Sequence, residues 1–115
     1  MGDSEKYMKV IKYDKLVRNR IPEIIWESGR DCICSQLNGK EYIKALDKKL
    51  TEELKEYQES KSMEELADLL EVVRAVAKAR GSSIEEVEKI REEKARRRGG
   101  FEKRILLEEV VEDDE

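Results

Sequence analysis

Residues 51–74 read TEELKEYQESKSMEELADLLEVVR, and this stretch decides the fold that the sequence predicts. It contains two acidic phrases, EELKE at residues 52–56 and EELAD at residues 64–68, each with carboxylates three residues apart. A short polar break at residues 59–62 separates the two phrases. A break of this length makes two helices antiparallel neighbours, so we expect a helical hairpin that carries both acidic phrases.

The acidic phrases also have an ordinary explanation, because the whole chain is rich in charge. Its 115 residues include 28 Asp and Glu and 24 Lys and Arg. Carboxylates three residues apart also occur elsewhere, as at Glu85 and Glu88, without special meaning. A Glu-x-x-Glu phrase taken alone is therefore typical of a solvated helix face.

Helical angles distinguish some of these acids from the others. At about 100° per residue, Glu53 falls inside the apolar stripe of its helix, and Glu56 lies on the flank of that stripe. On the second helix of the hairpin, Glu65 falls inside the apolar stripe, and Asp68 borders it. The acids that avoid the stripes are Glu52, Glu59, Glu64 and Glu71. A carboxylate that points at a core is costly unless it is paired or binds a cation.

Register brings the inward-facing acids of the two helices to one level. If the hairpin folds about the middle of the polar break, Glu56 lies level with Glu65. Glu53 then lies level with Asp68. Four carboxylates in one layer repel one another unless a cation neutralises them, and all-oxygen ligation selects hard ions. The sequence therefore predicts a site for Mg²⁺, with Mn²⁺ as a substitute.

The rest of the chain also predicts helices. Pro22 suits the first turn of a helix that runs to about residue 28. We expect the two hairpin helices over about residues 40–58 and 62–81, because apolar residues recur there with helical spacing. Ser83 is a suitable N-cap for a fourth helix over residues 84–98, which two glycines end.

Two segments outside these helices contain strand-forming residues. Residues 32–37 predict a short strand, and residues 104–111 predict either its partner strand or a last helical turn. The predicted fold class is thus mainly all-α, a helical-hairpin bundle of about four helices with a small two-stranded β element as an option. We expect one domain over residues 1–115, with its core at about 13–108 and a frayed acidic tail at 112–115.

Composition restricts the chemistry of the chain. It contains no His, which excludes nucleophile activation by His and zinc sites that use it. Only 38% of residues are hydrophobic and 45% are charged, so we expect a second copy to cover apolar surface. No transmembrane run or signal-peptide pattern is present, and Cys32 and Cys34 are too close for an ordinary disulfide. We therefore expect a cytoplasmic protein with reduced thiols and no membrane contact.

Phosphate chemistry needs cations from the protein, and two basic groups offer them. The first consists of Lys15, Arg18 and Arg20, and the second of Lys94, Arg96, Arg97 and Arg98. On the fourth helix Arg91, Lys94 and Arg98 continue the apolar face, which predicts that they point inward. Favourable interaction with the helix C-terminus explains the second group equally well. No Walker A loop is present, and a net charge of −4 without an aromatic stacking platform disfavours nucleic-acid binding.

Further segments on both sides of the acidic hairpin belong to the same sequence pattern. The segment YDKLVR at residues 13–18 leads into IPEII at residues 21–25, and RGGFE occupies residues 98–102. With the phrases Glu-Glu-x-x-Glu and Glu-Glu-x-x-Asp, these segments resemble the MazG-like all-α nucleoside-triphosphate pyrophosphohydrolases. That superfamily includes phosphoribosyl-ATP pyrophosphohydrolase and the dimeric dUTP and dCTP hydrolases. The similarity covers most of the chain and is strongest to a small stand-alone branch.

The resemblance implies a fold that associates through its helices, as a homodimer or homotetramer, and a nucleotide substrate. It implies Mg²⁺-dependent hydrolysis of the α–β phosphoanhydride to a nucleoside monophosphate and pyrophosphate, a reaction that clears unwanted nucleotides. The metal-ligating and catalytic residues by this resemblance are Glu53, Glu56, Glu65 and Asp68. The candidates for phosphate contact are Lys15, Arg18, Lys94, Arg97 and Arg98. Which carboxylate orients the attacking water stays open.

Two departures from the family pattern leave the substrate undetermined. Relatives often carry an Asp-Lys pair where this chain has Asn19 and Arg20, and no base-recognition pocket can be matched. The preferred base and sugar therefore stay open. The alternative function is a non-enzymatic helical interaction module, in which the acids pair with Lys and Arg across an interface between copies.

Overall fold

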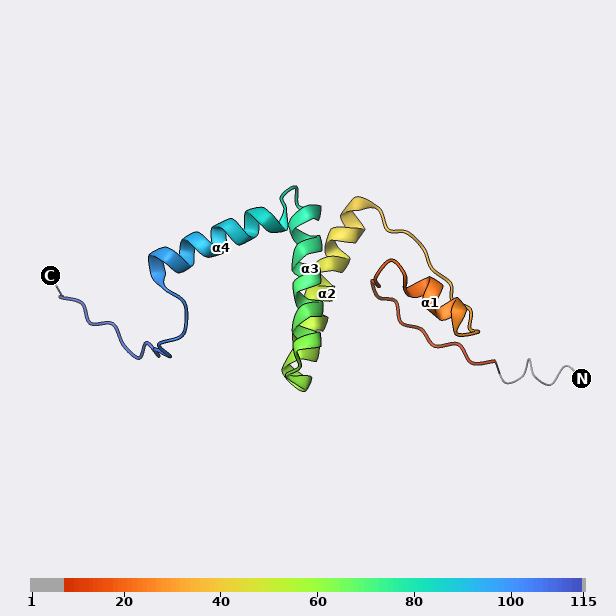
Figure 1. Cartoon of the computed structure of the whole chain (residues 1–115), viewed down its shortest axis with the longest axis horizontal. Coiled ribbons are helices and arrows are strands. Elements are labelled where there is room, and N and C mark those ends of the chain that lie inside the picture. Colours follow the sequence, from red (N-terminus) through yellow and green to blue (C-terminus); the bar gives the residue numbers. More distant parts are fainter. Residues whose placement is uncertain (1–7, 115) are drawn as a thin grey trace, which may run out of the picture.

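A computed structural model describes residues 8–114, and their regular structure consists of four helices (Figure 1). They are α1 (Ile21–Glu27), α2 (Gly39–Ser60), α3 (Met63–Ala79) and α4 (Ile84–Arg98). The predicted all-α fold is confirmed within this part of the chain. Each predicted helix is present, and its bounds agree with the expected ones to within two residues.

Helix α2 is defined by strong local signals at both ends. The Asn38 side chain accepts a hydrogen bond from the backbone N–H of Glu41 at 2.8 Å, and the Glu41 carboxylate accepts one from the N–H of Asn38 at 3.4 Å. This reciprocal cap satisfies N–H groups that the first turn leaves free. At the other end Lys61 adopts a left-handed conformation, with φ 59° and ψ 18°, and donates its N–H to the Tyr57 carbonyl at 2.7 Å.

Helix α3 begins immediately after this turn. The Ser62 side chain accepts a hydrogen bond from the backbone N–H of Glu65 at 3.2 Å and so caps the helix. Because only Lys61 and Ser62 lie between the two helices, α3 runs back along α2, and Figure 1 shows the two side by side. The turn therefore fixes which residues of α2 and α3 lie at the same level.

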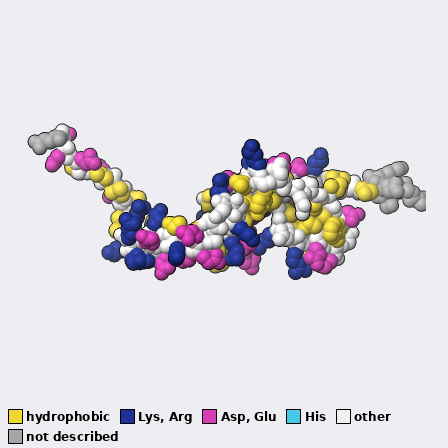
Figure 2. Space-filling view, turned by 90° about the horizontal axis from the view of Figure 1, so that it is seen from above, with side chains coloured by type: hydrophobic (Ala, Val, Ile, Leu, Met, Phe, Trp, Pro, Cys, Tyr) yellow, Lys and Arg dark blue, Asp and Glu magenta, His cyan; other side chains and the backbone are white. Residues whose placement is uncertain are grey.

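The hairpin has a small core for a chain of this length. Its buried apolar side chains, among the residues that the structure describes, are Leu46, Val72 and Ala77. Helix α2 contacts α3, α3 contacts α4, and α1 contacts no other helix. The molecule is consequently elongated, with extents of 85 × 30 × 29 Å, and many large apolar side chains are exposed (Figure 2).

Helix α4 projects away from the hairpin instead of packing along it (Figure 1). Gly81 takes a φ of 83° in the turn after α3, which sends the chain off at an angle. The prediction that Arg91, Lys94 and Arg98 point inward is therefore wrong, because all three are exposed. Of the other described helices only α3 contacts α4, and even the apolar Ile90 is 52% exposed.

The optional β element is not seen in residues 8–114. Residues 32–37 and 104–111 carry neither strand nor helix, so the predicted strand, its partner and the last helical turn are all wrong. The physical reason is distance, because the two segments lie at opposite ends of the molecule and cannot exchange backbone hydrogen bonds (Figure 1). Cys32 and Cys34 are free thiols, as expected. Residues 112–114 are likewise irregular, and residue 115 lies outside the described range.

Candidate metal centre

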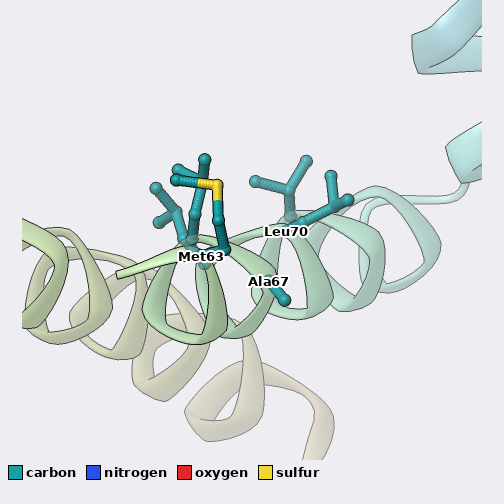
Figure 3. A pocket seen from close by; sticks show the side chains of 6 residues that line it. Met63, Ala67 and Leu70 are labelled. Carbon is teal, nitrogen blue, oxygen red and sulfur yellow. The ribbon is translucent and has the colours of Figure 1, made fainter. Parts of the chain in front are cut away.

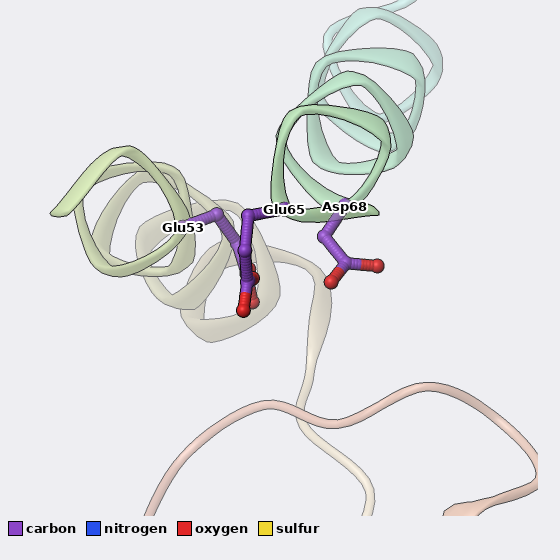
Figure 4. Close-up of side chains that lie close together, drawn as sticks. All are labelled: Glu53, Glu65 and Asp68. Carbon is purple, nitrogen blue, oxygen red and sulfur yellow. The ribbon is translucent and has the colours of Figure 1, made fainter. Parts of the chain in front are cut away.

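Three carboxylates of the hairpin converge on one small volume. Glu53 comes from α2, and Glu65 and Asp68 come from the first two turns of α3. One carboxylate oxygen from each lies within 4.8 Å of the others. Figure 4 shows the three side chains pointing away from the helix axes to the same side. The hairpin turn produces this arrangement because it sets Glu53 and the first turns of α3 at one level.

Glu53 is the most constrained of the three. Only 7% of its surface is exposed, and it is the one charged residue that the structure buries among those it describes. Its Oε1 lies 3.3 Å from the Lys49 ammonium group, one turn earlier on α2. Its Oε2 is buried and has no hydrogen-bond partner among the described residues. A buried carboxylate oxygen without a partner is costly, and such a group calls for a ligand or a bound ion.

Burial and neighbouring negative charges raise the pKa values of two carboxyl groups in the cluster. Burial raises the pKa of Glu53, and the charges of Glu56 and Asp68 add to this, although Lys49 opposes them. Burial also raises the pKa of Glu65, followed by the charges of Glu56, Asp68 and Glu53. Glu56 is thus close enough to act on both residues, although it lies outside the group of three. Protons or cations are therefore favoured at this position.

A second ion-pair group lies beside the carboxylates on α2. Glu52 Oε1 is 3.2 Å from Lys15 Nζ and 3.2 Å from Lys49 Nζ. Burial would raise the pKa of Glu52, but the hydrogen bonds and charges of Lys15 and Lys49 outweigh it and lower that pKa. Although Glu52 avoids the apolar stripe of its helix, its side chain is half-buried and paired with Lys15.

The N-terminal segment also contacts the cluster directly. Arg18 donates a hydrogen bond from Nη2 to Oδ1 of Asp68 at 2.6 Å, although the two residues are 50 apart in sequence. In Figure 4 this segment, drawn in faint red, passes on the side to which the carboxylates point. Lys15 and Arg18, predicted as phosphate contacts, are thus brought to the acidic site and lie on its carboxylates.

The positive charge at the site does not balance the negative charge. Among the residues that the structure describes, five carboxylates meet three cationic side chains, which leaves two negative charges uncompensated. The acids are Glu52, Glu53, Glu56, Glu65 and Asp68, and the cations are Lys15, Arg18 and Lys49. All of the free donor atoms are oxygens, the ligand type that Mg²⁺ and Mn²⁺ prefer. The residues present therefore fit a divalent hard cation.

The basic group at the end of α4 is not part of this site in the single chain. Lys94, Arg97 and Arg98 are exposed on a helix that leads away from the hairpin, and Figure 2 shows Lys and Arg side chains gathered around that part of the molecule. Arg97 pairs at 3.7 Å with Glu93 of its own helix. The predicted phosphate contacts therefore divide into two that the structure brings to the carboxylates and three that it does not.

Sequence reasoning missed Lys49 as a member of the site. This residue lies four positions before Glu53 and three before Glu52, so its ammonium group reaches both carboxylates. Its side chain is only 16% exposed. The signal was present in the sequence, because a Lys one turn before an inward-facing Glu shares its helix face.

No family model matches the chain, and no solved structure matches it. An uncharacterized protein of Mycolicibacterium smegmatis (strain ATCC 700084 / mc(2)155) is 52% identical over 42 residues, which is 36% of this chain and 43% of that protein. The chain thus matches less than half the length of this relative. Among residues 8–114, no helix combines the length and apolar character needed to cross a membrane.

The burial of Glu53 predicts an effect on stability. Because its folded-state pKa is raised, its charge destabilises the fold at pH 7, and this penalty disappears as the pH falls through the raised pKa. In EDTA at pH 7, we expect Glu53→Gln to raise the melting temperature by roughly 2–5 °C. The difference in melting temperature from the unmodified chain should narrow as the pH falls through the raised pKa of Glu53.

Thermal unfolding followed by circular dichroism measures this effect. The matched control is Glu59→Gln, the same change at an exposed position of α2, for which we expect no difference that depends on pH. A lower melting temperature for Glu53→Gln at pH 7 would contradict the conclusion that the carboxylate is disfavoured in its charged form.

Proposed function

We propose that this chain is a Mg²⁺-dependent nucleotide pyrophosphohydrolase whose cation is held by Glu53, Glu65 and Asp68, with Glu56 beside them. The observation that carries the proposal is the buried Oε2 of Glu53, which has no hydrogen-bond partner among the described residues and lies in a group of converging carboxylates. A solvated helix face would not bury a carboxylate in this way. The uncompensated negative charge of the site also supports a cation of charge two.

The proposed reaction is hydrolysis of the α–β phosphoanhydride of a nucleoside triphosphate or a phosphoribosyl nucleotide. A bound divalent ion would supply polarisation of phosphoryl oxygens and a more acidic bound water. Lys15 pairs with Glu52 and Arg18 pairs with Asp68, so both positive charges lie beside the cluster and would attract the phosphates of a substrate. The resemblance to MazG-like enzymes supports this reaction. It also favours the cytoplasm, where nucleotides are abundant.

Lys94, Arg97 and Arg98 are proposed as further phosphate contacts on the resemblance alone. In the single chain they are carried away from the carboxylates by α4. They could therefore serve this site only from a second copy of the chain or after a movement of α4. The proposal for Lys15 and Arg18 does not depend on them.

The outer face of α3 supports association with a second copy. Met63, Leu66, Leu70 and Val73 recur at alternating intervals of three and four residues, the spacing of a helix–helix contact. Figure 3 shows Met63 and Leu70 projecting from α3. With Ala67 and Leu69, these four residues line an apolar groove of about 340 Å³. Leu70 is 60% exposed and Met63 is 67% exposed, so this face lacks a partner within the described chain.

The charges along α3 favour an antiparallel copy of the same helix as that partner. Glu64 lies at the N-terminal end of α3 and Glu71 at its middle, whereas Arg74 and Lys78 lie in its C-terminal half. A two-fold axis places the acidic half of one helix beside the basic half of the other, whereas parallel packing opposes like charges. We therefore propose a homodimer through this face, and a homotetramer would need a second contact.

The alternative interaction module predicts that the acids pair with Lys and Arg across an interface. In the structure Lys15, Arg18 and Lys49 make these pairs within one chain. Association through α3 requires no contribution from the acidic cluster. The dimer and the enzyme are thus compatible, and the enzyme accounts for the carboxylates better.

A pyrophosphate-release screen tests the enzymatic proposal. We expect release from at least one substrate among NTPs, dNTPs and phosphoribosyl-ATP with Mg²⁺ or Mn²⁺, and loss of it on chelation by EDTA. Glu53→Gln and Asp68→Asn should each reduce the rate by about a hundredfold or more, because each removes a carboxylate that would hold the cation. Glu64→Gln, the same change at an exposed site on α3, should leave the rate unchanged. Full activity in Glu53→Gln would exclude the proposed site.

The homodimer is tested by Leu70→Lys and analytical ultracentrifugation. Leu70 is 60% exposed in the chain, so Lys at this position should leave the helix folded but prevent its burial in an interface. We expect the unmodified protein to sediment as a dimer and the variant as a monomer. Leu106→Lys, at an 82% exposed position outside the helices, is the control and should remain dimeric. A monomeric unmodified protein, or a dimeric Leu70→Lys variant, would contradict this interface.

A further inference from the structure

Arg18 forms an ion pair with one carboxylate oxygen of the cluster. Its Nη2 lies 2.6 Å from Oδ1 of Asp68, and Asp68 is one of the three residues whose oxygens converge. The two residues are 50 apart in sequence. Arg18 lies in irregular chain, three residues before the start of α1. The cluster thus already holds a cationic group from the chain at the position proposed for a divalent ion.

A guanidinium group and a divalent cation cannot share this position without cost. Both are positive, and at contact distance their repulsion is large unless water separates them. The ion pair is weak enough to yield, because the Arg18 and Asp68 side chains are 58% and 41% exposed. An arriving divalent ion therefore competes with Arg18 for Asp68.

We infer that Arg18 exchanges partners at this site: it neutralises Asp68 when no divalent ion is bound, and the ion displaces it toward substrate phosphates. The inference rests on the proposed metal site and adds a role for one residue within it. It explains why a side chain expected to contact phosphate is found on a carboxylate. In this role Arg18 protects the carboxylates from mutual repulsion before loading and becomes an anion-binding group afterwards.

Contacts other than the Arg18–Asp68 ion pair hold the N-terminal segment on the hairpin. The Arg18 side chain can therefore move while the segment stays in place. Lys15 is bound to Glu52 at 3.2 Å, and Glu52 is not one of the three converging carboxylates. Leu16 is half-buried and lies with Ala45 of α2 in the lining of one small pocket. This anchor does not involve Asp68, so release of Arg18 breaks one ion pair and leaves the others in place.

Arg20 provides a matched comparison. It lies two residues further along the same segment, and it is engaged with Glu23 at 3.0 and 3.3 Å, away from the cluster. Arg20→Gln removes the same charge from nearly the same place but touches no converging carboxylate. A difference between Arg18→Gln and Arg20→Gln therefore reports the contact with Asp68 rather than the general charge of the segment.

Titration calorimetry with Mn²⁺ alone tests the exchange. We expect Arg18→Gln to bind Mn²⁺ about two- to fivefold more tightly than the unmodified chain, because no ion pair has to be broken. Arg20→Gln should bind as the unmodified chain does. Arg18→Lys, which keeps the charge without the planar guanidinium group, should lie between the two. Circular dichroism checks that each variant is folded.

A second titration uses the preformed complex of Mn²⁺ with inorganic tripolyphosphate. For this ligand Arg18→Gln should bind several-fold more weakly, because the released guanidinium group is absent. Opposite changes for the two ligands are the signature of the exchange. Equal Mn²⁺ affinity in Arg18→Gln and the unmodified chain would overturn the exchange but leave the metal site intact. No Mn²⁺ binding by the unmodified chain would overturn both proposals.

Discussion

The burial of Glu53 between α2 and α3 is the constraint on which the rest of the site depends. A carboxylate with 7% of its surface exposed must find a positive partner or lose much of its charge. Lys49 satisfies one of its oxygens at 3.3 Å, and the other has no partner among the described residues. The neighbouring acids increase the cost, because they repel the same charge. The chain retains an unfavourable group here, as is common where function has shaped a site.

The hairpin supplies the rigidity that such a site needs. The caps at Asn38 and Ser62 and the left-handed turn at Lys61 fix both helices, and the register of the carboxylates follows from them. The core behind them is small, so the single chain gains little stability from apolar burial. We propose different roles for the exposed apolar face on α3 and for the negative site with its basic side chains. In this proposal the apolar face would bind another copy of the chain, and the negative site would bind a cation and then the phosphates of a substrate.

Much of the hairpin could be predicted because its signals are local. Ser62 and Ser83 mark helix starts, and helical angle separates Glu53 from exposed acids such as Glu59. The contacts of Arg18 with Asp68 and of Lys15 with Glu52 depend instead on how an irregular segment lies against α2, which no periodicity reveals. The direction of α4 is likewise set by the turn before it. The strand predictions failed because residue preference cannot show whether a partner strand lies within reach.

The most direct test of the cation site is a crystal structure of the protein grown with Mn²⁺, examined for anomalous scattering. We expect an anomalous peak bound by oxygens of Glu53, Glu65 and Asp68, with Oε2 of Glu53 among the ligands. We also expect that Lys49 remains near Glu53 Oε1. A structure at the same Mn²⁺ concentration with no peak in the cluster would contradict the account and leave a charged helical hairpin without a metal site.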